Sequence, residues 1–288
     1  GSRAKWRKFW GGGRMRFISK YLIFAGVIFG ISATHSFAAS YVETPTLEHR
    51  VSTGDLPPVE ERLPENPSVV ELGQPDGVGE EYGTHGGVMR MIMSRAKDIR
   101  MMVVYGYARL VGYNKEFDLE PDILEKADVK DGRIFTLQLR KGHKWSDGHP
   151  FTSEDFRFFW EDVALHKKLS KSGPHRIFWV NGKLPKFEVL GAYTVRYTWQ
   201  DPNPFFLPSL AKARPVFIYR PAHYLKQFHA GYVNKGKLKA LVKAANKRNW
   251  RSLFAGKARL YRNTNPDLPS LQPWYVTNSM PSERFIFT

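Results

Sequence analysis

The sequence contains no cysteine, and this absence excludes several kinds of chemistry at once. Without a thiol the chain cannot form a disulfide, bind a metal through thiolates or use a cysteine nucleophile. It also lacks the cysteine that a lipoprotein signal needs for acylation. Its length of 288 residues and its hydrophobic content of 42% are enough for one large or two ordinary domains with an apolar core.

Sequence motifs of common enzyme classes are missing as well. There is no Gly-x-Ser-x-Gly, no His-Glu-x-x-His and no Walker-type phosphate loop. The acidic pairs Glu154-Asp155 and Glu161-Asp162 are adjacent in the chain, so their members do not face each other across a cleft as a hydrolase dyad does. Nine His residues are scattered without a tight pair, which favours surface or capping roles over a metal site. We predict a protein that is not an enzyme and uses no cofactor or metal.

Acidic residues are scarce compared with basic ones. The chain has 27 Asp and Glu against 44 Lys and Arg, a formal net charge of +17. Residues 202–266 contain fourteen Lys or Arg and no acidic residue. Charge alone would allow such a stretch to bind nucleic acid. The simpler interpretation is a solvated basic helix face above a buried apolar stripe, and we expect no nucleic-acid partner.

Residues 1–38 indicate export. We exclude residues 1–14 from the fold as upstream sequence. Arg16 and Lys20 form a charged region around the start of the apolar run 21–31, which has the length of a signal peptide and is short for a membrane span. Small residues precede a cleavage point after Ala38. We therefore expect a cleavable signal and a periplasmic protein without a lipid anchor, and an uncleaved signal anchor is the alternative.

One stretch carries most of the information about the fold. Residues 135–156 read FTLQLRKGHKWSDGHPFTSEDF. Its first part alternates apolar and polar residues as a half-buried strand does, and Lys141-Gly142 and Asp147-Gly148 are turn pairs. Thr152 followed by Asp155 is a variant of the capping box and predicts the start of a helix with an apolar face. The residues alone thus predict a strand, two turns and a helix.

The run LRKGHKWSDGHPFTSEDF resembles the signature of the extracytoplasmic solute-binding proteins of family 5. These are the peptide-, nickel- and oligosaccharide-binding proteins of ABC importers. Other segments resemble the family too: two alternating strands in residues 186–199, and the sequence LPSLQPW at residues 268–274. The resemblance extends over roughly residues 86–288, and in the family a second lobe follows.

The resemblance implies an α/β fold of the type II periplasmic binding proteins, with the first lobe and an accessory sub-domain present and the second lobe absent. Within the first lobe we expect strands at residues 86–93, 215–219 and 284–288, and a basic amphipathic helix at residues 234–249. The predicted division is 1–38 for upstream residues and signal peptide, 39–85 for an extended lead-in, 86–115 for the first part of lobe I, 116–210 for an accessory α+β sub-domain and 211–288 for the truncated second part of lobe I.

The resemblance also implies the function. Family members close two lobes over an extended ligand by hinge motion and then deliver it to the importer's membrane permease subunits. We expect a monomer that captures peptides, with main-chain hydrogen bonds supplying affinity. Binding of an oligosaccharide or a nickel complex is the alternative within the family. A basic envelope protein that adheres to anionic polymers is the alternative outside it.

Two segments are expected to face the ligand cleft in this picture. One is the loop at residues 95–107, and the other is the hinge-side segment at residues 271–275. Their aromatic side chains are candidates for ligand contact, and their arginines for pairing with a ligand carboxylate. The predicted ligand-binding residues are Arg95, Arg100, Tyr105, Tyr107 and Trp274. No catalytic residue or metal ligand is predicted.

Overall fold

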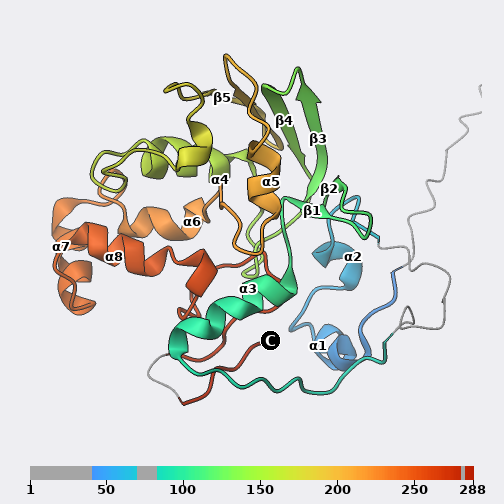
Figure 1. The fold of residues 1–288 in the computed structure, drawn as a ribbon. Helices are drawn as coiled ribbons and strands as arrows, with labels where there is room; N and C mark the ends of the chain where they lie inside the picture. Colours follow the sequence, from blue (N-terminus) through green and yellow to red (C-terminus); the bar gives the residue numbers. More distant parts are fainter. Residues whose placement is uncertain (1–40, 70–82, 280–282) are drawn as a thin grey trace, which may run out of the picture. The chain divides into compact units, whose positions relative to one another are not determined.

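The structure is a computed structural model of the chain, and it describes residues 41–69, 83–279 and 283–288. Tyr41–Thr288 belongs to a single unit (Figure 1). The predicted upstream residues and signal peptide lie outside the described residues. Within the described residues, no helix combines the length and the apolar character needed to cross a membrane.

Antiparallel pairing produces two sheets in the described part of the chain (Figure 1). One is a two-stranded sheet of β1 and β2, and the other is a four-stranded sheet with the order β3-β4-β6-β5. The strands are β1 (Val111–Tyr113), β2 (Leu119–Pro121), β3 (Leu124–Lys130), β4 (Ile134–Leu139), β5 (Lys186–Gly191) and β6 (Thr194–Thr198). The predicted strand at the start of the signature stretch is confirmed as β4, and the two strands predicted in residues 186–199 are confirmed as β5 and β6.

Short helices connect and cover these strands. The α-helices are α1 (Glu48–Ser52), α2 (Val59–Arg62), α3 (Met101–Gly106), α4 (Ser153–Arg157), α5 (Phe206–Ala211), α6 (Ala222–Leu225), α7 (Lys235–Ala244) and α8 (Trp250–Lys257). The 3-10 helices are η1 (Pro45–Leu47), η2 (Ala96–Arg100), η4 (Arg176–Phe178), η5 (Lys226–Phe228) and η6 (Leu260–Arg262). Helix α4 continues directly into a π-helical segment, η3 (Phe158–Ala164).

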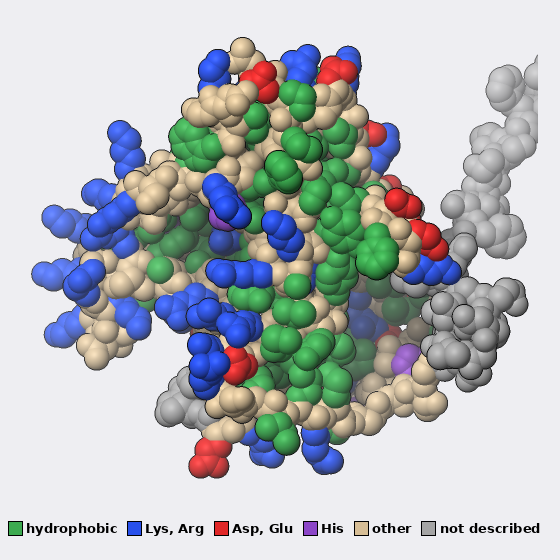
Figure 2. Space-filling model, viewed as in Figure 1, with side chains coloured by type: hydrophobic (Ala, Val, Ile, Leu, Met, Phe, Trp, Pro, Cys, Tyr) green, Lys and Arg blue, Asp and Glu red, His purple; other side chains and the backbone are tan. Residues whose placement is uncertain are grey.

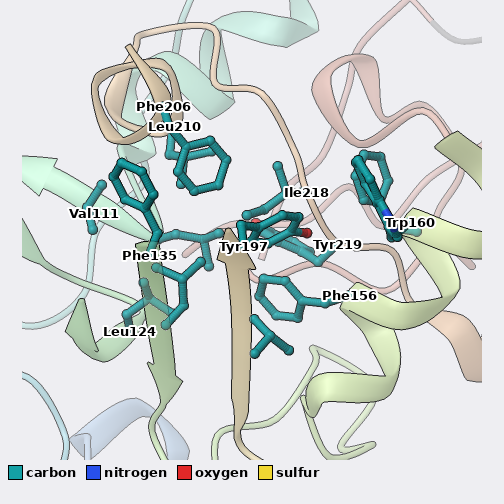
Figure 3. Packing of buried hydrophobic residues seen from close by; sticks show 14 of the residues in the cluster. Val111, Leu124, Phe135, Phe156, Trp160, Tyr197, Phe206, Leu210, Ile218 and Tyr219 are labelled. Carbon is teal, nitrogen blue, oxygen red and sulfur yellow. The ribbon is translucent and has the colours of Figure 1, made fainter. Parts of the chain in front are cut away.

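The buried face of the four-stranded sheet follows from the alternation in β4 and β6. Phe135 is opposite Tyr197, Leu137 is opposite Val195, and all four side chains are buried. Large apolar pairs across neighbouring strands stabilise an antiparallel sheet. Side chains from α4, α5 and residues 218–219 pack around Phe135 and Tyr197 and complete this hydrophobic cluster (Figure 3).

A second hydrophobic cluster involves the helices α6, α7 and α8. Its buried members are Phe158, Ala222, Leu225, Phe228, Leu238, Leu253 and Phe254. The helix formed by α4 and η3 contributes to both clusters, because Phe156 and Trp160 belong to the first and Phe158 to the second. The predicted apolar face of this helix is confirmed at Phe156 and Trp160, but the burial of Phe158 was not predicted. The i to i+5 hydrogen bonds of a π-helix shift side chains around the axis relative to the spacing assumed for an α-helix.

Three predicted strands of the first lobe are wrong. Residues 86–93 and residues 215–219 contain no strand, and residues 284–288 contribute a single bridge, between Phe287 and Val276. Alternation of apolar side chains predicts burial on one face, but a strand forms only when its backbone finds a neighbouring strand.

The predicted basic helix at residues 234–249 is correct in kind and too long. Helix α7 begins after Asn234, whose side chain accepts a hydrogen bond of 2.8 Å from the backbone N–H of Lys237. It ends before Asn246, which has a positive φ of 47°. Asn249 then caps α8, so the polar residues near the end of the predicted helix separate two shorter ones.

Candidate functional site

The signature stretch is part of the hydrophobic core, and its polar residues make structural contacts. Thr152 Oγ1 accepts the backbone N–H of Glu154 at 3.3 Å, and Asp155 Oδ2 accepts that of Thr152 at 3.0 Å, which confirms the predicted capping box. Asp155 Oδ1 accepts the N–H of Ala222 at 2.9 Å and so connects α4 to α6. Burial raises the pKa of Asp155, and these hydrogen bonds act in the opposite direction.

A second contact joins the signature to the LPSLQPW segment. The backbone N–H of Ser146 donates to the carbonyl of Ser270 at 2.9 Å, and the N–H of Ser270 donates to Ser146 Oγ at 3.0 Å. Two of the stretches that resemble the family therefore contact each other. This contact positions the hinge-side segment that carries Trp274.

A groove of about 1310 Å³ lies between η3, residues 174–181, residues 202–217 and η6. Its lining is apolar at Phe159, Ile177 and Val216, among others. On the face shown in Figure 2, Lys and Arg side chains gather over α7 and α8 and around the hollow beside these helices. A concave, partly apolar cavity with convergent polar groups is the usual form of a ligand site.

The groove has a strongly basic lining. No Asp or Glu lines it, and none of its Lys and Arg side chains forms an ion pair with a carboxylate of the described residues. The basic residues that line the groove are Arg176, Lys212, Arg214, Arg220, Arg259 and Arg262.

Two of these arginines lie against aromatic rings, and one of them, Arg220, also donates hydrogen bonds to the backbone. The guanidinium of Arg220 lies 5.3 Å from the ring centroid of Phe159 and donates to the carbonyl of Tyr219 at 2.7 Å. The guanidinium of Arg214 lies 5.3 Å from the ring centroid of Tyr261. Burial lowers the pKa of Arg220 to about 10, so this side chain still carries its charge at neutral pH.

The pKa of His175 is affected by the positive charges of the groove. Burial lowers the pKa of His175 below its ordinary value, and the charges of Arg176, Lys212 and Arg214 lower it further. Its Nδ1 accepts the backbone N–H of Ile177 at 3.3 Å, as the cap of η4. The charge of the groove at neutral pH therefore comes from its Lys and Arg side chains.

Arg109, which the sequence analysis missed, connects α3 to one wall of the groove. Its buried guanidinium donates to the carbonyls of Val103, Lys212 and Ala213 at 2.9, 2.9 and 3.0 Å. It also lies 4.7 Å from the ring centroid of Tyr107. A charged residue within the apolar run YGYARLVGY was the available signal. These hydrogen bonds fix the backbone from which Lys212 extends into the groove.

The structure brings three of the predicted ligand residues into neighbouring segments. A Cβ on Gly106 would lie 3.0 Å from the ring of Pro273, so the backbones around Tyr105, Tyr107 and Trp274 approach closely. Tyr105 and Trp274 are exposed by 57% and 40%, which leaves both available for contact. The hydroxyl of Tyr107 instead donates to the carbonyl of Ala211 at 2.8 Å.

The two predicted arginines share one acidic partner. Arg100 lies 3.3 Å and Arg95 lies 3.9 Å from the carboxylate of Asp98. Trp274 lines a small cavity of about 20 Å³, and Leu260 lines both this cavity and the basic groove. Of the five predicted residues, Trp274 is thus linked to the groove through Leu260, and none of the five lines the groove itself. The sequence analysis did not predict the groove. No group of three or more His, Asp or Glu suited to a metal ion occurs in the described ranges.

Comparison with known proteins identifies the family. Residues 118–256 match the model described as bacterial extracellular solute-binding proteins, family 5 Middle. Residues 118–256 therefore belong to this family. The resemblance predicted from the signature stretch is confirmed, and the family-5 match contains that stretch entirely.

Two curated proteins are similar to this chain. The periplasmic alpha-galactoside-binding protein of Rhizobium meliloti (strain 1021) is 31% identical over 212 residues, which cover 64% of this chain and 29% of that protein. The periplasmic oligopeptide-binding protein OppA of Escherichia coli (strain K12) is 46% identical over 102 residues, which cover 31% of this chain and 19% of OppA. The chain therefore spans less than a third of the length of either protein.

Among solved structures, an oligopeptide-binding protein OppA superposes with a TM-score of 0.72 at 30% identity. The superposition covers 88% of this chain and 38% of that one. The predicted α/β fold of the type II periplasmic binding proteins is confirmed, and the covered share corresponds to a single lobe. The division of the lobe at residues 116 and 210 stays a prediction.

Proposed function

We propose that the protein is the periplasmic solute-binding subunit of an ABC importer and that its solute is a peptide. The observation that carries this proposal is the likeness to the OppA structure over 88% of the chain at 30% identity. The 46% identity to Escherichia coli OppA over 102 residues supports the same ligand class.

This chain would supply one wall of the ligand cleft, and closure of a second lobe would bury the solute. The exposed Tyr105 and Trp274 would pack against the peptide, and Tyr107 would hold the adjoining backbone. Arg95 and Arg100, which share Asp98, would be available to a peptide carboxylate. The closed form would then dock on the permease subunits as a monomer.

An α-galactoside is the second candidate solute. The match to the galactoside-binding protein of Rhizobium meliloti covers 212 residues, about twice the length of the match to Escherichia coli OppA. Trp179 and Phe205 line the groove and are exposed by 42% and 69%, so they offer flat apolar faces to a ligand.

Calorimetry on the complete gene product tests the proposal. The ligands are a set of tripeptides and tetrapeptides and, separately, an α-galactoside trisaccharide. We expect peptide dissociation constants in the micromolar range, about −8 kcal/mol of binding free energy, and no heat from the sugar. Trp274→Ala should weaken peptide binding, whereas Lys237→Ala on α7 should not. Sugar binding without a response to any peptide would replace the peptide with the second candidate.

A further inference from the structure

The Lys and Arg side chains that line the basic groove form no ion pair with the carboxylates of the described residues. Elsewhere in the same region basic side chains do find carboxylates: Arg157 and Lys226 each lie 2.7 Å from Glu154. In the groove none of the lining Lys and Arg side chains has such a partner among the described carboxylates, although Arg220 is fixed by its own backbone and by Phe159. The protein therefore leaves this set of positive charges uncompensated within the part of the chain that the structure describes.

These charges converge on one part of the groove. Arg176, Lys212 and Arg214 line the groove together with His175, whose pKa their positive charges lower. Arg214 also contacts the ring of Tyr261 in η6. Arg259, two residues before Tyr261, and Arg262, directly after it, line the groove as well. Cations from three separate segments thus line one groove, and two of these segments are in contact through Arg214 and Tyr261.

Uncompensated charges of one sign in a concave site favour a ligand of the opposite sign. Walls of low dielectric constant focus the field and raise the local concentration of anions. Guanidinium groups fit carboxylates particularly well, because two parallel N–H groups match two oxygens. The apolar lining at Ile177 and Val216 offers contact to the aliphatic part of a side chain that ends in a carboxylate.

The groove is also large enough for more than one residue of a peptide. Its volume of about 1310 Å³ exceeds the roughly 300–1,000 Å³ that is usual for a pocket that holds a small ligand. Leu260 lines both the groove and the small cavity at Trp274. A peptide that lies against Trp274 can therefore place a neighbouring side chain in the groove.

We propose that the basic groove gives this solute-binding protein a preference for acidic peptides, whose Asp and Glu side chains bind between the loop at residues 212–214 and η6. The inference rests on the proposed function and adds the charge class of the peptide. It assigns Arg214, Arg259 and Arg262 as determinants of specificity.

The test compares tetrapeptides of matched shape on the complete gene product by calorimetry. Ala-Glu-Glu-Ala, Ala-Gln-Gln-Ala and Ala-Lys-Lys-Ala differ in charge and little in size. We expect the acidic peptide to bind roughly tenfold more tightly than the Gln peptide at low salt. Raising the ionic strength should weaken binding of the acidic peptide alone, because salt screens exposed charges.

Variants locate the effect. Arg214 and Arg262 are exposed, so the double variant Arg214→Gln/Arg262→Gln should fold normally and bind the Glu and Gln peptides with similar affinity. Lys237→Gln/Lys239→Gln on α7 removes the same number of charges outside the groove and should preserve the preference. Far-ultraviolet circular dichroism of each variant checks the fold.

Each other outcome has a definite meaning. Equal affinity for the Glu and Gln peptides in the unaltered protein would overturn the acidic preference and leave the proposed function intact. Loss of the preference in the α7 variant would overturn the assignment to the groove. Failure to bind any of the three peptides would overturn the proposed function itself. Tighter binding of a single-stranded oligonucleotide than of the acidic peptide would replace the peptide by an anionic polymer.

Discussion

The indole Nε1 of Trp145 donates a hydrogen bond of 3.1 Å to Oδ2 of Asp155, and both side chains are buried. The same carboxylate caps α4 at Thr152 and accepts the backbone N–H of Ala222. One side chain therefore joins a turn, a helix start and a second helix. The residues by which the family is identified stabilise the lobe, and the ligand specificity must be sought elsewhere.

Asp155→Ala should lower the free energy of unfolding by about 3 kcal/mol, because it leaves buried N–H donors without an acceptor. Asp155→Asn keeps one acceptor oxygen and should cost clearly less. Urea unfolding of the two variants beside the unaltered protein measures the difference. Equal losses in both variants would show that the acceptor role of Asp155 is not what stabilises the contact.

Arg109→Met should also destabilise the protein, by roughly 3 kcal/mol, since the carbonyls of Val103, Lys212 and Ala213 lose the donor that the buried guanidinium provides. Arg133→Met removes a half-exposed arginine and serves as the control. Thermal unfolding should separate the two variants clearly. Similar melting temperatures would contradict the role given to Arg109.

Glu154 should make the stability of the protein depend on pH in the acidic range. Hydrogen bonds from Arg157 and then Lys226 lower the pKa of Glu154 to about 2, from an ordinary value of 4.5. Because the folded-state pKa is the lower one, the stabilisation is complete above pH 4.5 and is lost as the pH falls toward 2. Urea unfolding of Glu154→Gln should therefore show a deficit at pH 6 that shrinks by pH 3. A loss of stability that is the same at both pH values would exclude this ion-pair contribution. The control variant Glu60→Gln, at an exposed residue of α2, should lose no stability at either pH.

His175 should titrate below its ordinary value in the free protein, and a bound anion should raise its pKa. The shift arises from burial and from the charges of Arg176, Lys212 and Arg214, which an acidic ligand would offset. Proton NMR of the imidazole with and without Ala-Glu-Glu-Ala measures both values. Arg176→Gln should raise the pKa of His175 in the free protein, whereas Lys237→Gln should leave it unchanged.

Local patterns in the sequence predicted the elements whose stabilising contacts are near in the chain. The alternation in residues 135–139, the turn glycines and the capping box at Thr152 all depend on neighbours within a few residues. The strand expected at residues 86–93 depends on a partner that the residues themselves do not specify. Its absence shows that the alternation of apolar and polar residues does not by itself predict a paired strand.

The candidate site was harder to predict for the same reason. The basic composition of residues 202–266 was visible, but it was interpreted as a solvated helix face. This interpretation is correct for much of α7, but it did not predict the groove. Arg176 lies outside that stretch. The contact between Arg214 and Tyr261 joins a residue that precedes α7 in the sequence to one that follows α8. A count of basic residues along the sequence does not show which of them the fold brings to one groove.

The shared helix of α4 and η3 has a consequence for how the chain unfolds. Phe156 is buried in one hydrophobic cluster and Phe158 in the other, within a single turn. Because this turn belongs to both clusters, opening one cluster also disturbs the side chains that the turn places in the other. The amide hydrogens of the two clusters should therefore exchange as one cooperative unit. A boundary drawn at residue 210 would then cut through one cooperative unit, as it also cuts through the family match at residues 118–256, and residues 116–210 alone would leave Phe158 exposed to water.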